Sequence, residues 1–66
     1  MNEEALNASI RKFLRTVGVN SQREIEQAVR AAVQARPETK ALAATMTLEI
    51  AELGLKVSYD ASIDLQ

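Results

Sequence analysis

The chain has 66 residues, which is enough for one domain, 1–66, and leaves no room for a separate catalytic lobe. It contains no Cys and no His, which excludes zinc, haem and iron–sulfur sites built from these ligands. The net charge is −1. No apolar run approaches the roughly 18 residues of a membrane span, and no basic segment precedes an apolar one as in a secretory signal. We therefore expect a cytoplasmic protein without a membrane segment.

An amphipathic stripe predicts a first helix over residues 3–17. Its apolar side chains recur at the spacing of one helical face: Leu6, Ile10, Phe13, Leu14 and Val17. Asn2 is placed to cap the N-terminus, and Gly18 can end the helix in the left-handed conformation that glycine adopts without strain. We therefore expect a turn directly after Val17.

A second helix is predicted over residues 21–35. Ser21 and Glu24 have the spacing of a capping box, in which each side chain accepts from the other residue's backbone N–H. The apolar stripe resumes with smaller side chains: Ile25, Ala28, Val29, Ala32 and Val33. Pro37 ends this helix, and the polar residues 36–41 are expected to form a loop.

After the loop, the apolar pattern changes from helical spacing to strict alternation. This predicts two strands, 42–50 and 55–65, joined by a four-residue hairpin loop that ends at Gly54. Such a loop pairs Ile50 with Leu55, and the same register brings together on one face the apolar pairs Leu48–Val57 and Met46–Tyr59. On the polar face it aligns Glu49 with Lys56.

These elements predict an α+β fold of the order α-α-β-β, a two-layer sandwich with two N-terminal helices packed on one face of an antiparallel hairpin. A two-stranded sheet leaves both edges unpaired, so we expect a homodimer through a sheet edge, or an unknown protein partner at that edge. The second strand has no following element to cover it, and the predicted contact residues on it are Ser58, Asp60 and Ser62.

Nothing in the sequence predicts catalysis. Tyr59 falls on the apolar face, where an aromatic core residue is the favoured interpretation. Asp60 and Asp64 are about 13 Å apart along a strand, too far to share a proton or a metal ion. Gly18 and Gly54 alone cannot form a phosphate-binding loop. We therefore expect no enzymatic activity, no cofactor and no small-molecule substrate.

A weak nucleic-acid-binding regulator of the helix-turn-helix type is the alternative hypothesis. The basic side chains on the outer faces of the two predicted helices would carry the contacts: Arg11, Arg15, Arg23 and Arg30. The spacing departs from the common motif, because Glu24 stands where an apolar anchor is usual and Ile25 follows it. We therefore favour an ordinary corner between two helices with solvated outer faces.

Two stretches of the chain carry a resemblance to a known family. They read SIRKFLRTVGVNSQREIEQAVR, at 9–30, and ATMTLEIAELGL, at 44–55. Together they resemble a small proteobacterial family of unknown function, whose members are single domains of about this length. The resemblance covers nearly the whole chain and implies a bacterial, cytoplasmic protein. Its motifs are structural, so it implies no catalytic or binding residue.

Overall fold

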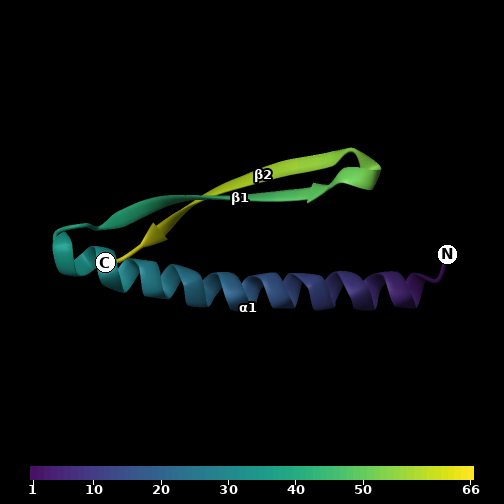
Figure 1. Ribbon diagram of the computed structural model, residues 1–66, viewed down its shortest axis with the longest axis horizontal. Coiled ribbons are helices and arrows are strands. Elements are labelled where there is room, and N and C mark those ends of the chain that lie inside the picture. Colours follow the sequence, from purple (N-terminus) through teal and green to yellow (C-terminus); the bar gives the residue numbers. More distant parts are fainter.

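The computed structural model describes all 66 residues and contains one helix followed by one hairpin. Helix α1 spans Glu3–Ala35, the strands β1 and β2 span Ala41–Ile50 and Leu55–Asp64, and a short 3-10 turn, η1, spans Ala51–Leu53. The chain reverses direction after α1, and the hairpin runs back along the helix (Figure 1). Consequently η1 lies towards the N-terminal end of α1.

The two outer ends of the helical region agree with the sequence prediction. The side chain of Asn2 accepts a hydrogen bond from the backbone N–H of Ala5 at 3.1 Å, so Asn2 is the N-cap and the helix begins at Glu3. At the other end, the backbone N–H of Arg36 donates to the Ala32 carbonyl at 2.9 Å, one residue before Pro37. Proline has no N–H with which to extend this ladder.

The predicted break between two helices is wrong. Residues 18–21 are helical, Gly18 has no positive φ, and Ser21 lies in the middle of α1 rather than at a capped N-terminus. The reason is that the apolar stripe keeps its phase, because Val17, Ser21 and Ile25 follow at intervals of four. A turn would leave two more helix ends to be capped, whereas a glycine inside a helix costs only about 1 kcal/mol relative to alanine.

The two-layer sandwich with two N-terminal helices is therefore wrong as well, although the α+β class stands. A corner would have placed two short helices side by side over the hairpin. Instead, one helix of 33 residues runs beside a sheet of two strands. The layer that should cover the sheet is thus only one helix wide.

The predicted register of the hairpin is confirmed. The strands pair antiparallel with Ile50 opposite Leu55 and Met46 opposite Tyr59, as the alternation requires. Gly54 caps η1 with a φ of 63°, the left-handed conformation that a glycine adopts at no steric cost. Glu49 lies opposite Lys56, but the two side chains form no ion pair.

Hydrogen bonds between side chains cross the polar face of the hairpin. The Thr45 hydroxyl donates to the Asp60 carboxylate at 2.9 Å, and the hydroxyls of Thr47 and Ser58 are 3.0 Å apart. These contacts join residues that lie directly opposite each other in the register. Part of the polar face therefore pairs its own side chains, and the apolar face is the one left for packing.

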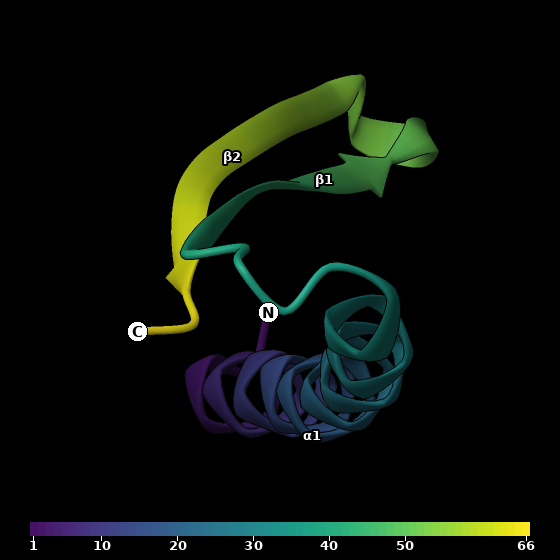
Figure 2. The same cartoon turned by 90° about the vertical axis from the view of Figure 1, so that its left-hand side faces the viewer.

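The apolar face is not closed into a core. No residue of the chain is buried, and the molecule is elongated, with extents of 51 × 21 × 17 Å. The radius of gyration is 15.9 Å; a compact domain of this length has about 11 Å. Figure 2 shows the cause, since the hairpin arches away from the single helix instead of lying flat on it.

Candidate functional site

The main concave feature is an apolar groove between α1 and the hairpin. We call it the open groove and define it by residues that face each other across it. From α1 these are Ile10, Phe13, Leu14, Ser21, Ile25, Ala28 and Ala32, and from the hairpin Leu42, Ala44, Met46, Leu48, Ile50, Leu55, Tyr59 and Ile63.

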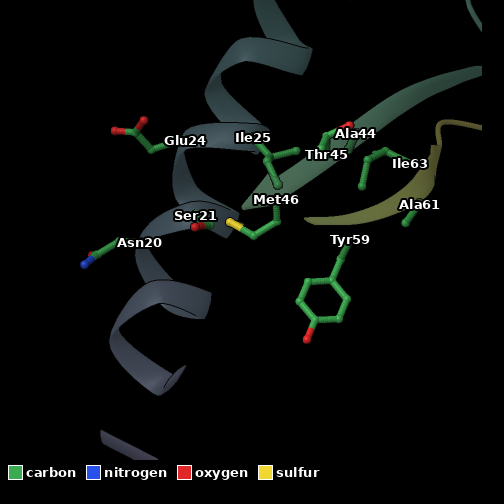
Figure 3. Close-up of a pocket in the computed structure, with 10 residues that line it drawn as sticks. All are labelled: Asn20, Ser21, Glu24, Ile25, Ala44, Thr45, Met46, Tyr59, Ala61 and Ile63. Carbon is green, nitrogen blue, oxygen red and sulfur yellow. The ribbon is translucent and has the colours of Figure 1, made fainter. Parts of the chain in front are cut away.

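The middle of the open groove has a volume of about 710 Å³ and is lined by 10 residues (Figure 3). Met46 points towards α1, where it lies near Ile25 and Ser21. The ring of Tyr59 projects beside the groove, and its hydroxyl does not point towards Ser21 or Glu24. Met46 is 44% exposed and Tyr59 is 60% exposed, so the one aromatic residue of the hairpin contributes little to a core.

The two ends of the groove differ in how far they are closed. Near the connection between α1 and β1, the side chains of Val29, Val33, Ile63 and Leu65 are half-buried. Towards η1 the hairpin diverges from the helix (Figures 1 and 2), and larger residues such as Phe13 are left exposed there. The sequence explains the difference, because the small side chains of the C-terminal half of α1 permit a closer approach.

The groove has little electrostatic character. Glu24 and Arg36 are the charged residues that line it, one in the middle and one at the closed end. The one ion pair of the structure joins Arg30 to Glu26 at 3.9 Å within α1, with both side chains well exposed. An exposed pair of this kind adds little to stability. What the groove offers to a ligand is therefore apolar contact.

The predicted partner residues Ser58, Asp60 and Ser62 lie on the polar face of β2, outside the groove. The backbone N–H of Leu65 donates to the Lys40 carbonyl at 2.8 Å, which makes this a hydrogen-bonded pair. Such pairs alternate with non-bonded ones along an antiparallel ladder, so the N–H and C=O groups of the three predicted residues point to the free edge. An additional strand at this edge stays a prediction.

The predicted helix-turn-helix is wrong, because its turn does not exist, while weak nucleic-acid binding by the same arginines stays a prediction. Arg11, Arg15, Arg23 and Arg30 all lie on one continuous helix, and no second helix is set at an angle to present them to a groove of DNA. By helical spacing they are spread over about a third of the helix circumference, and Arg30 is paired with Glu26.

Sequence reasoning did not identify the open groove, because it assigned the groove residues to a closed core. A signal was nevertheless present. For a chain of 66 residues, the free energy gained by apolar burial roughly equals the free-energy cost of the conformational entropy lost on folding, so a single copy is expected to be only marginally stable.

Two further findings bear on function. No three acidic side chains come together where they could hold a metal ion. Helix α1 is long enough to cross a membrane, but no stretch of it is sufficiently apolar to do so.

Comparison with known proteins identifies the family. The chain matches a family of unknown function (DUF6494) over residues 1–66 and therefore belongs to it. This confirms the family resemblance seen in the sequence, while a proteobacterial origin stays a prediction. No curated protein and no solved structure matches the chain.

Proposed function

We propose that this member of a family of unknown function is a non-catalytic interaction module, which acts by packing the open groove against another protein surface. The observation that carries the proposal is the absence of any buried residue in a chain with long, well-formed secondary structure. The helix and the hairpin are well formed, but their apolar faces are uncovered. Such faces are stable only when another surface packs against them, so we infer a partner.

The size of the uncovered surface supports this function. The chain exposes 5985 Å², whereas a compact monomer of 7.2 kDa exposes about 4,100 Å². The excess of about 1,900 Å² exceeds the area that one partner contributes to a standard protein–protein interface, about 800 Å². Monomeric proteins rarely expose contiguous apolar patches larger than a few hundred Å².

The chemistry of the groove favours binding over catalysis. Its middle section contains one carboxylate, Glu24, and no basic side chain. The Tyr59 hydroxyl points away from Ser21 and Glu24, so these three polar groups do not converge on one point (Figure 3). A catalytic site needs such convergence within hydrogen-bond reach.

The cytoplasmic location expected from composition is part of this proposal and is checked by fractionation of cells.

Site-specific photo-crosslinking in the native cell tests the proposal. A photoreactive benzophenone residue replaces Tyr59, which lines the groove, or Ser58, its neighbour on the polar face of the same strand. We expect ultraviolet light to give a discrete protein adduct from the Tyr59 position and much less from the Ser58 position. Absence of any adduct at Tyr59 would show that the groove meets no protein and would overturn the proposal.

A further inference from the structure

We infer that the protein surface that fills the open groove is a second copy of this chain, so that two copies form one closed core from two incomplete ones. This inference rests on the proposed function and names its partner. It concerns the apolar groove and is distinct from a dimer through the sheet edge.

The first argument is the area available. Two separate copies expose about 12,000 Å² together, and a compact protein of twice the mass exposes about 6,800 Å². Closing two copies into one globule therefore buries about 5,100 Å² in total, which matches the largest obligate homodimer interfaces, about 5,000 Å² and above. A single copy has no means of burying this surface, because its one helix cannot cover both strands.

The second argument is the character of the groove. Both of its walls are mainly apolar, and its charged residues are Glu24 in the middle and Arg36 at the closed end. A groove with only these two isolated charges does not select a charged peptide or a nucleic acid, because it offers little complementary charge. Obligate homodimer interfaces resemble a hydrophobic core cut in two, and the open groove fits this description.

The third argument is symmetry. Any occupant must present an apolar surface of matching length. The groove of another copy does so, because it is the same surface. A two-fold axis uses the same patch on both copies, so one arrangement covers both grooves at once. The exposed side chains with most to gain are Phe13, Leu14, Met46 and Tyr59, which come from both walls.

The sheet edge is the weaker candidate for the same interface. The outward N–H and C=O groups at Ser58, Asp60 and Ser62 are exposed and can bond to water, so a second strand exchanges one set of hydrogen bonds for another. Edge pairing also leaves Phe13 and Leu14 of α1 uncovered. The groove therefore accounts for the exposed apolar surface, and the edge does not.

Sedimentation of the full chain over a range of concentrations tests the inference, with a pair of matched variants. Phe13 and Val19 are equally exposed, at 53% and 52%, but Val19 lies on the far side of α1, nine residues or about two and a half turns after Ile10. We expect the unaltered chain to sediment at twice 7.2 kDa. Phe13→Glu should raise the dimer dissociation constant about thirtyfold or more, whereas Val19→Glu should leave it unchanged.

A second measurement does not depend on a disruptive substitution. The chain has no Cys, so Met46→Cys and Thr47→Cys each carry a single thiol, on the apolar and the polar face of β1 respectively. We expect the maleimide reactivity of the thiol at position 46 to fall as the chain concentration rises through the dimer transition. The reactivity at position 47 should stay constant.

Two results would overturn the inference. The first is a chain that stays monomeric at every concentration, with constant thiol reactivity at position 46. In that case the proposed function survives only if the benzophenone at position 59 still crosslinks to a different protein. The second is a dimer that persists in Phe13→Glu and is lost in Ser58→Pro, which removes an outward N–H of β2 and would place the interface at the sheet edge.

Discussion

Met46 lies directly opposite Tyr59 in the hairpin, and both side chains line the groove beside Ile25 of α1. A methionine beside an aromatic ring is a favourable cross-strand pair. In the single chain, however, about half of each side chain still faces solvent. At this pair the strand register is therefore complete, whereas the apolar core around it is still open to solvent.

We expect Gly18→Ala to stabilise the protein. Gly18 is helical, and a Cβ added there has no neighbouring atom within 4 Å. Alanine is about 1 kcal/mol more favourable than glycine inside a helix, so the free energy of unfolding should rise by about that amount in urea denaturation. A decrease would indicate a turn with positive φ at this position, which alanine tolerates poorly.

Ser21→Ala should also be mildly stabilising, by up to about 0.5 kcal/mol, because alanine is the better residue inside a helix. Ser21 has no side-chain hydrogen bond to lose, and it faces the apolar groove. If Ser21 capped a second helix, the same substitution would destabilise the protein by about 1 kcal/mol. The sign of the change in thermal melts distinguishes the two cases.

Asn2→Ala should lower the free energy of unfolding by about 1 kcal/mol, because it removes the acceptor for the Ala5 N–H. Asn2→Asp keeps an acceptor and adds a negative charge at the helix N-terminus, so it should retain the stability. Far-ultraviolet circular dichroism during denaturation measures both. Equal stability of the three proteins would show that α1 is frayed at this end.

Gly54→Ala should destabilise the hairpin by about 1–2 kcal/mol, since an L-residue with a side chain at a φ of 63° is strained. Gly54→Asn should cost less, because asparagine tolerates the left-handed region. The comparison with Gly18→Ala is informative: the same chemical change is expected to have opposite signs at the two glycines of the chain. Urea titrations of the two variants under identical conditions provide the check.

The hairpin was predictable because its signals are local and agree with one another. Strict alternation assigns the apolar face, and a loop of four residues then allows only the register that pairs Ile50 with Leu55. The predicted strand ends at the loop, Ile50 and Leu55, match the observed ends, and the two outer ends differ by one residue each. The predicted alignment of Glu49 with Lys56 is confirmed, but the two exposed side chains form no ion pair, because register aligns side chains without holding them together.

The helix was mispredicted because local and longer-range signals disagree. Gly18, Asn20 and Ser21 are typical of a turn, and each lowers helix propensity slightly. The apolar positions on either side keep one continuous phase, which is a property of the whole segment rather than of three residues. A count of helical phase from Val17 to Ile25 would have favoured the single helix.

The open groove could not be predicted from the pattern alone, because apolar periodicity shows which side chains turn inward and not how much covers them. The list of inward residues was right in outline for both the helical region and the hairpin. The missing quantity was the width of the covering layer, which depends on whether the chain supplies one helix or two.

Residues 36–40 are the only covalent tie between α1 and the hairpin, and no backbone hydrogen bond joins the two elements beyond it. The angle between them is therefore set by side-chain packing, most of which a second copy would supply. In the proposed dimer, folding and assembly would form a single equilibrium, and we expect the melting temperature to rise with the concentration of the chain. Newly made copies that find no counterpart would then stay open to proteases, and we would expect cellular abundance to be limited to what can pair.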